Sequence, residues 1–154
     1  RIVALAFGAA DFLRDMGRSY LAMSENENEI LYARSRIALT SRVAGIVAID
    51  TPYFGPIIDQ EGLLKETRLA APLGFKGKLV IHPTHIGIVN KVFTPSSEEV
   101  QYAKRIIEAY DNAVRGGLGA ASLDGRMIDY ATYEMGKSLL SFADVAAQKQ
   151  KLRE

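Results

Sequence analysis

Three short apolar runs stand out in the first half of the chain. They cover residues 2–7 (IVALAF), 46–49 (IVAI) and 78–81 (KLVI), and glycine or polar residues bound each of them. A continuous apolar run of this length, unlike an alternating one, is typical of a strand that is buried on both faces of a parallel sheet. The pattern therefore predicts three buried parallel strands.

Between the runs, apolar residues recur at helical spacing. Ser24 stands three residues before Glu27, the spacing of a capping box, and predicts a helix that extends to about Ala44. A second helix is expected over residues 60–71, closed by Pro72. A short helical turn is expected in AADFLRDMG, directly after the first strand.

Residues 94–154 are expected to be helical, apart from one glycine-rich connector. The segment TPS at residues 94–96 opens a helix in which Pro95 takes the first helical position. The connector RGGLGAASLDG follows, and a second long helix begins at Asp129 or Tyr130.

Strands that alternate with helices predict βαβ units, which place their strands in one parallel sheet. Three strands alone form a poor parallel sheet, because both outer strands expose unpaired backbone groups. The pattern therefore predicts the end of a larger α/β architecture. The chain begins with Arg1, which leads into an apolar run without an initiating methionine. This beginning agrees with a chain that starts partway through a fold.

The composition is that of a globular domain, with 154 residues of which 48% are hydrophobic and 24% charged. The 19 basic and 18 acidic side chains give a formal charge of +1, which indicates neither a nucleic acid nor a membrane partner. The absence of cysteine excludes disulfides, thiolate nucleophiles and cysteine-ligated zinc. No apolar run approaches the roughly 20 residues of a membrane span and no signal-peptide pattern is present, so we expect a cytoplasmic protein.

In parallel α/β folds, ligands bind at the carboxyl ends of the strands. The candidates there are Asp11, Asp50 and His82, one after each predicted strand. A carboxylate three residues past a glycine at a strand end suits Mg²⁺, which prefers carboxylate oxygens and retains water. Asp11 equally fits a cap of the short helix that follows it, and Asp50, which precedes Thr51 and Pro52, fits an Asx-type turn. Both alternatives stay open at this point.

The remaining motifs carry less chemistry. His82 and His85 stand three residues apart, but a zinc site needs further ligands, and Pro83 biases His82 toward an extended backbone. GGLGAA is only loosely similar to a dinucleotide fingerprint, because it follows a helix and lacks the third glycine. Asp129 fits first the N-cap of the last helix.

One segment is similar to the signature of a known family. GKLVIHPTHIGIVNKVFTPSSEEVQYAKRII resembles the Gly-Lys-x-x-Ile-His-Pro-x-Gln-Ile-x-x-Val-Asn-x-x-Phe-x-Pro signature of citrate lyase β-subunit-like proteins. This group includes malyl-CoA and citramalyl-CoA lyases and lies within the HpcH/HpaI aldolase superfamily. FGAADF resembles the metal-binding segment of the family, GIVAID its next strand and SLDGRMIDY its C-terminal segment. The matches are in order and extend over about residues 3–140.

The resemblance implies an α/β fold that is the C-terminal part of a TIM-type (β/α)8 barrel. Residues 1–93 would hold about the last three β/α units, and residues 94–154 would form a C-terminal helical extension that packs on a neighbouring subunit. Because the family is commonly trimeric or larger, a homo-oligomer is implied. The substrate-binding arginine of the family, and the glutamate that shares its Mg²⁺, would lie upstream of Arg1.

The resemblance also implies a Mg²⁺-dependent carbon–carbon lyase that cleaves or forms a malyl-CoA, citramalyl-CoA or citryl-thioester substrate. Asp11 would bind the Mg²⁺, and Asp129 would do acid/base work in the site of a neighbouring subunit. The residues implied to lie near the acyl-CoA are Asp50, Pro52, His82 and Pro83. His85 stands where the family usually has glutamine. Two alternatives remain: a 2-oxo-3-deoxy acid aldolase of the same superfamily, and a non-catalytic binding or assembly module.

Overall fold

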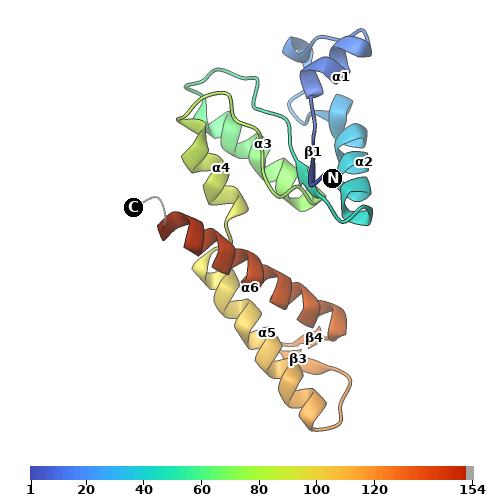
Figure 1. The fold of residues 1–154 in the computed structure, drawn as a ribbon, viewed down its shortest axis with the longest axis vertical. Coiled ribbons are helices and arrows are strands. Elements are labelled where there is room, and N and C mark those ends of the chain that lie inside the picture. The colour runs from blue at the N-terminus through green and yellow to red at the C-terminus, as the bar shows by residue number, and fades with distance from the viewer. Residues whose placement is uncertain (152–154) are drawn as a thin grey trace. The chain divides into compact units, whose positions relative to one another are not determined.

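The computed structural model describes residues 1–151 and divides the chain into two compact units, Arg1–Phe93 and Thr94–Glu154 (Figure 1). The first unit contains β1 (Ala4–Ala6), α1 (Ala9–Asp15), the 3-10 helix η1 (Tyr20–Ala22), α2 (Asn28–Val43), β2 (Val47–Ile49), α3 (Gln60–Leu73) and α4 (His85–Phe93). The second unit contains α5 (Ser97–Arg115), β3 (Ala121–Leu123), β4 (Arg126–Ile128) and α6 (Tyr130–Lys151).

The strands β1 and β2 form a parallel pair, with α2 in the connection between them. Ala4, Leu5 and Ala6 of β1 lie opposite Val47, Ala48 and Ile49 of β2. The N–H of Phe7 continues the ladder by donating to the carbonyl of Ile49 at 3.0 Å. Because parallel strands end at the same edge of a sheet, the turn at Gly8 and the residues that follow β2 are neighbours in space.

Apolar side chains of the helices pack against this small sheet and against each other. Ile30 and Ala38 lie on the inner face of α2, and Leu63 and Ala70 lie on that of α3. Burying a side chain of the size of Ile30 or Leu63 contributes roughly 1.5–3 kcal/mol. The buried members of the three core clusters are Phe7, Ala9, Leu13, Ile30, Ala38, Ala48, Tyr53, Leu63, Ala70, Phe75 and Val89.

In the second unit, α5 and α6 pack along each other, with Ala103 and Ile106 of α5 buried. Gly136 of α6 allows a close approach, because a Cβ there would lie 3.4 Å from the carbonyl oxygen of Ala103. A capping box starts α5: the Glu99 N–H donates to the Ser96 hydroxyl at 3.1 Å, and the Ser96 N–H donates to the Glu99 carboxylate at 2.7 Å.

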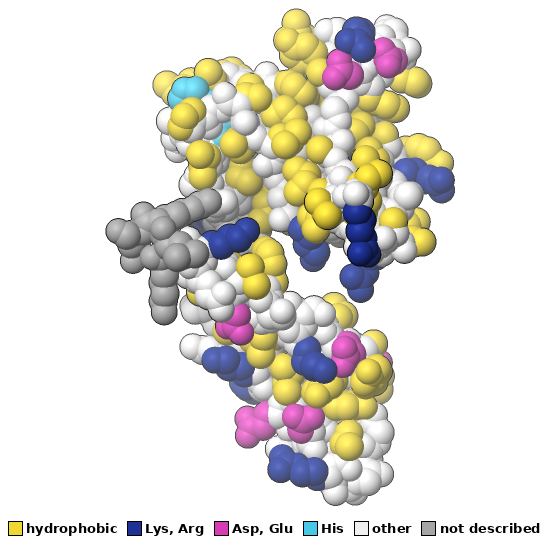
Figure 2. Space-filling model, viewed as in Figure 1, with side chains coloured by type: hydrophobic (Ala, Val, Ile, Leu, Met, Phe, Trp, Pro, Cys, Tyr) yellow, Lys and Arg dark blue, Asp and Glu magenta, His cyan; other side chains and the backbone are white. Residues whose placement is uncertain are grey.

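The surface seen in Figure 2 carries lysine and arginine side chains among aspartate and glutamate, with apolar side chains between them. On that face the two signs of charge are dispersed, which agrees with the formal charge of +1. Across residues 1–151, none of the helices combines the length and the apolar character that crossing a bilayer requires.

The α/β class is confirmed, but the prediction of three strands buried on both faces is wrong. Strand β2 leaves Val47 41% exposed. Within the described residues the run 78–81 forms no strand, and Lys78 alone makes a bridge, to Asp50. The strand β1 is not buried on both faces, since Leu5 is 39% exposed. Strand pairing depends on neighbours that are distant in sequence. A sheet of two strands leaves one edge of each strand unpaired and does not by itself bury their faces. For the same reason the described sheet does not form a barrel.

The predicted capping box at the start of α2 is also wrong. Glu27 is the N-cap of this helix with a left-handed φ of 51°, and its carboxylate pairs with Arg34 instead. Ser24 is held by Glu29, which accepts the Ser24 N–H at 3.1 Å and its hydroxyl at 2.9 Å. A buried ion pair therefore outcompetes the local motif for the Glu27 side chain.

Other element boundaries differ by smaller amounts. Pro72 lies inside the last turn of α3, which ends at Gly74 with a left-handed φ of 105°. Pro95 precedes the helix that it was expected to begin, since Ser96 is the N-cap of α5. The glycine-rich connector contains β3 and the turn of a hairpin that β4 completes. The turn residues Asp124 and Gly125 both have positive φ, as the tightest hairpin turns require. The helix α4 follows His82 and Pro83 and was not predicted.

Candidate active site

Asp11 lies at the carboxyl-terminal edge of the sheet, as the third residue of α1 after the N-cap Gly8. Its side chain is 75% exposed, and Oδ1 accepts a hydrogen bond from Nη1 of Arg14 at 2.8 Å. The Asp11 carboxylate lies against Gly8, since a Cβ at Gly8 would be in ordinary contact with Oδ2 of Asp11 at 3.6 Å. This accessible carboxylate can bind a hard cation, which would compete with Arg14 for the same oxygens.

The turn that carries Asp11 is tied to the end of β2. The N–H of Ala9, the first residue of α1, donates to Oγ1 of Thr51 at 3.2 Å. Ala9 is fully buried and Thr51 is nearly so. A buried backbone N–H needs an acceptor, and Gly8 has no side chain that could supply one. Thr51 therefore caps a helix that begins 42 residues before it.

Asp50, beside Thr51, is completely buried in an ionic network. Its two carboxylate oxygens accept hydrogen bonds from Arg34, at 2.9 Å from Nε and 2.7 Å from Nη2. Oδ2 also accepts from Nζ of Lys78 at 2.9 Å. Burial alone would raise the pKa of Asp50, but Arg34 and Lys78 outweigh it and lower the pKa below its usual value. A substrate would contact this carboxylate only if the network rearranged.

Two glutamates complete the network. Glu27 pairs with Arg34, and Glu66 pairs with Lys78, with both carboxylates nearly buried. The network thus holds three carboxylates against two cations. Burial raises the pKa of Glu66 to about 7; the attraction of Lys78 opposes this rise, while the repulsion and hydrogen bonding of Glu27 add to it. At neutral pH the surplus carboxylate therefore retains a proton for part of the time.

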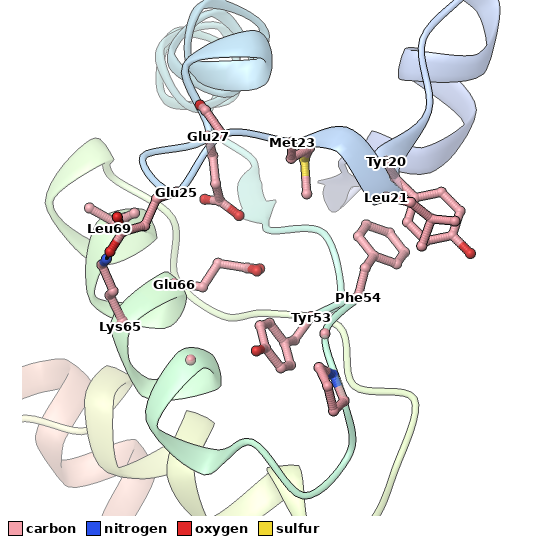
Figure 3. Close-up of a pocket in the computed structure, with 14 residues that line it drawn as sticks. Tyr20, Leu21, Met23, Glu25, Glu27, Tyr53, Phe54, Lys65, Glu66 and Leu69 are labelled. Atoms are coloured by element: carbon pink, nitrogen blue, oxygen red, sulfur yellow. Dashed lines mark hydrogen bonds and ion pairs between the residues drawn. The ribbon is translucent and has the colours of Figure 1, made fainter.

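Glu27 and Glu66 line a cavity of about 500 Å³ in the first unit. Figure 3 shows their side chains reaching toward each other from the segment before α2 and from α3. Apolar and aromatic side chains form much of the remaining wall, and the charged pair Glu25–Lys65 lies at its edge. The apolar and aromatic members are Tyr20, Leu21, Met23, Tyr53, Phe54 and Leu69. The cavity offers a long apolar wall with acidic groups, on the same side of the sheet as the strand ends.

Tyr53 holds the part of the cavity wall that lies between β2 and α3. Its hydroxyl donates to Oδ2 of Asp59 at 2.6 Å, and Asp59 caps α3 by accepting the Gly62 N–H at 2.9 Å. Burial and the neighbouring Asp59 carboxylate raise the pKa of Tyr53, whereas the hydrogen bond from Tyr53 lowers that of Asp59. A Cβ at Gly62 would collide with both the Tyr53 hydroxyl and the Asp59 carboxylate.

The two histidines do not form a metal pair. His85 is buried at the start of α4, where Nε2 lies 3.3 Å from the carbonyl oxygen of Ile57 and the ring packs edge-on against Tyr53. His82 is half-buried and its Nδ1 lies 2.8 Å from the Thr84 hydroxyl. Within residues 1–151 no three metal-binding side chains (His, Cys, Asp or Glu) come together. Pro52 is half-buried and Pro83 exposed.

Asp129 is the cap of α6 in the second unit. Its Oδ1 accepts hydrogen bonds from both the N–H and the hydroxyl of Thr132, each at 2.8 Å. These bonds, the backbone one first, lower the pKa of Asp129. The lowered pKa makes this carboxylate a weaker base than a free aspartate, while the two hydrogen bonds hold it in one orientation, as a positioned acid/base group requires.

For Mg²⁺, the described residues offer one accessible carboxylate at the strand ends, Asp11. Mg²⁺ is commonly held by one or two carboxylates, with water and substrate oxygens completing the shell. Asp11 therefore fits part of a magnesium site. No geometry for the ion follows from a single ligand.

Comparison with known proteins decides the family. A family model described as HpcH/HpaI aldolase/citrate lyase matches residues 1–83, more than half of the chain. The chain belongs to the HpcH/HpaI aldolase/citrate lyase family. The citrate lyase subunit beta of Haemophilus influenzae is 40% identical over 143 residues, which are 93% of this chain and 48% of that protein. The mitochondrial citramalyl-CoA lyase of Mus musculus is 35% identical over 95% of this chain and 42% of its own length.

A solved structure of this family shares the fold. It is the protein CitE of Mycobacterium tuberculosis in complex with magnesium, acetoacetate and coenzyme A, which matches with a TM-score of 0.74 and 30% identity. The match covers 90% of this chain and 51% of that one. The chain spans about half the length of the curated relatives it matches.

No sequence motif of this family member directly predicts the buried network. Its one signal is Arg34, which falls on the same helical face as Ile30 and Ala38, where an isolated cation needs a buried partner. Lys78 and Glu66 carry no such signal, because Lys78 begins an apolar run and Glu66 lies in a helix rich in charges. The role of Thr51 as a distant cap has no local sequence motif at all.

Proposed function

We propose that this chain belongs to a Mg²⁺-dependent carbon–carbon lyase that acts on a malyl-CoA, citramalyl-CoA or citryl-thioester substrate. The observation that supports this most directly is Asp11, an exposed carboxylate at the carboxyl edge of a parallel pair, in the segment FGAADF. Relatives over nearly the whole chain are named citramalyl-CoA lyase and citrate lyase subunit beta. A relative of known structure is in complex with magnesium, acetoacetate and coenzyme A.

In this proposal Asp11 holds the Mg²⁺, which when bound polarises the oxygens of the acid part of the substrate. Arg14, which shares the Asp11 carboxylate in the structure, has the charge and reach to approach the substrate acid when a cation takes its place. The α1 turn does the positioning, since it places the carboxylate beside Gly8 at the helix start.

Asp129 accepts or returns the proton that carbon–carbon cleavage moves. Its lowered pKa keeps it ionised near neutral pH, and the two Thr132 hydrogen bonds hold it in place. We propose that it acts in the site of a neighbouring subunit, in a homo-oligomer of three or more copies. This arrangement would make Asp11 and Asp129 of one chain work in different sites.

The acyl-CoA would run past Pro52, His82 and Pro83, which lie in the segments after β2 and after the 78–81 run. The aromatic wall of the cavity, with Tyr53 and Phe54 next to Pro52 in sequence, provides apolar surface for the uncharged part of the thiol arm. Asp50 has no exposed surface in this structure. We therefore assign it to holding the β2 end rather than to contacting the substrate.

The substrate class is tested by steady-state assays of the protein in its full natural length. Malyl-CoA, citramalyl-CoA and a citryl thioester are compared with free 2-oxo-3-deoxy acids, each with Mg²⁺ and with Asp11→Asn beside the wild type. The proposal expects cleavage of at least one thioester, lost in Asp11→Asn. Turnover of free acids alone would favour the aldolase alternative, and no turnover of either class would favour a non-catalytic module.

A further inference from the structure

One hydrogen bond near Asp11 joins two turns 42 residues apart, from the Ala9 N–H to the Thr51 hydroxyl at 3.2 Å. We infer that Thr51 is a positioning residue for the Asp11 carboxylate, acting through the start of α1. The inference rests on the proposed function, in which Asp11 holds the Mg²⁺. Thr51 is 1% exposed and does not line the cavity of Glu27 and Glu66, so its role is assigned to positioning rather than to substrate contact.

The helix α1 depends on a partner outside itself for its first backbone N–H group. The helix α1 has only seven residues, and its N-cap Gly8 makes no side-chain hydrogen bond. A helix this short is marginal alone, and its first N–H groups lack partners inside the helix. Thr51 supplies the acceptor for the first of them, so the direction in which α1 leaves the sheet is set from β2.

Thr51 is held in place by its neighbour Asp50. The preceding residue, Asp50, is fixed on both sides of its backbone, because its N–H donates to the Gly77 carbonyl at 2.8 Å and its carbonyl accepts from Leu79 at 2.9 Å. Its side chain is fixed by Arg34 and Lys78. The buried ionic network thus holds the residue on which the α1 turn rests.

Asp11 lies close to the Thr51 contact along the helix α1. Asp11 is two residues after Ala9, within the first turn of α1, so a change in where this turn starts moves the Asp11 carboxylate directly. Outer partners that orient a metal ligand commonly change metal affinity by about 10–100-fold when they are removed. A lost Thr51 hydroxyl should therefore weaken Mg²⁺ without changing any ligand atom.

The test is Mg²⁺ titration calorimetry on the protein in its full natural length. Thr51→Val is isosteric and removes the acceptor, while Thr51→Ser keeps it. We expect Mg²⁺ to bind about tenfold more weakly to Thr51→Val and within about twofold of wild type to Thr51→Ser. Hydrogen exchange at the Ala9 amide gives a second readout without metal: it should become faster in Thr51→Val only.

The matched control is Thr67→Val. Thr67 is another fully buried threonine of the first unit, but its hydroxyl donates to the Leu63 carbonyl within α3, away from Asp11. A Thr67→Val variant that loses as much thermal stability but keeps its Mg²⁺ affinity separates positioning from general destabilisation. If Thr51→Val does not fold, Thr51→Ala is compared with Thr67→Ala in the same way.

Unchanged Mg²⁺ affinity in folded Thr51→Val overturns the inference, as does an equal loss of affinity in Thr67→Val. Asp11→Asn separates this failure from that of the proposed function. If Asp11→Asn binds Mg²⁺ as the wild type does, the metal assignment itself is wrong. If Asp11→Asn loses Mg²⁺ and Thr51→Val does not, only the positioning role is wrong.

Discussion

Glu27 and Glu66 both face Arg34, which pairs with Glu27 and has its Nη2 at 3.9 Å from Oε1 of Glu66. With Asp50 they set three buried acids against the two cations Arg34 and Lys78. Glu66 comes from α3 and Glu27 from the segment before α2, and Figure 3 shows both at the same cavity. No sequence motif links the two glutamates. Because the buried network holds one more acid than it has cations, the protonation of these acids affects the stability of the folded state. Stability should therefore respond to pH through this pair.

The raised pKa of Glu66 gives the sign of this response. The folded pKa of about 7 lies above the ordinary 4.5, so the folded state binds the proton more tightly than the unfolded chain. The contribution is full below about pH 4.5 and is lost as pH rises through 7. Between pH 5 and pH 8 we expect the wild type to lose about 2 kcal/mol relative to Glu66→Gln.

Urea unfolding of both proteins at pH 5, 6, 7 and 8 measures this difference. The groups that face Glu66 are Lys78, Arg34, Glu27 and Tyr53. Glu25→Gln serves as the control, because Glu25 is an exposed carboxylate at the same cavity. Parallel pH curves of wild type and Glu66→Gln would contradict the raised pKa of Glu66.

Arg34 should be among the most sensitive positions of the first unit. Arg34→Met keeps an unbranched side chain but leaves Asp50 and Glu27 buried with one cation fewer. Breaking a buried ion pair from one side costs about 3–5 kcal/mol. The control is Arg36→Met, two residues along the same helix and exposed, for which a change within about 0.5 kcal/mol is expected. Equal unfolding midpoints of the two variants in urea would refute a structural role of the network.

Two helical glycines should respond to alanine with opposite signs. A Cβ at Gly62 would collide with the Tyr53 hydroxyl and the Asp59 carboxylate, so Gly62→Ala should break the Tyr53–Asp59 hydrogen bond and lower the melting temperature. Gly87 in α4 has nothing within 4 Å of such a Cβ. Gly87→Ala should therefore stabilise, by about 0.5–1 kcal/mol. Thermal unfolding checks both, and a rise in melting temperature for Gly62→Ala would show that the wall is looser than the structure indicates.

Asp129 combines capping with the proposed proton transfer, and two substitutions separate these roles. Asparagine caps a helix as well as aspartate does, so Asp129→Asn should melt near the wild type yet lose about 100-fold or more in kcat. Asp129→Ala should lose both stability and activity. Wild-type kcat in Asp129→Asn would leave the residue a cap only.

A mixing experiment tests whether Asp129 acts across a subunit interface. Asp11→Asn and Asp129→Asn chains, each inactive alone, are co-expressed and purified together. If the two residues of one site come from different chains, about a quarter of the sites in a random mixture hold both native carboxylates. Activity should return to that fraction. A mixture as inactive as its components would mean that both residues belong to the same chain's site.

How far the sequence predicts this molecule depends on the range of the interactions. The α1 turn with Asp11 and the Asp129 cap follow from residues a few positions apart, and both lie where the pattern puts them. The run 78–81 has the composition of a strand but only one residue of it is paired, because a strand also needs partners at distant positions. The Arg34–Asp50 ion pair and the Thr51 cap join segments 16 and 42 residues apart, which no local pattern records.

We propose that Asp11 holds the Mg²⁺ on which thioester cleavage depends, and kinetics of Mg²⁺ activation test this assignment. The rate of malyl-CoA or citramalyl-CoA cleavage is followed against Mg²⁺ concentration for the wild type, Asp11→Asn and Asp15→Asn. Asp15 is the matched control, since it lies on the same helix, is similarly exposed and also pairs with Arg14. If Asp11 holds the Mg²⁺, we expect saturable Mg²⁺ activation in the wild type and Asp15→Asn, and none in Asp11→Asn. Equal Mg²⁺ activation in all three proteins would contradict this assignment.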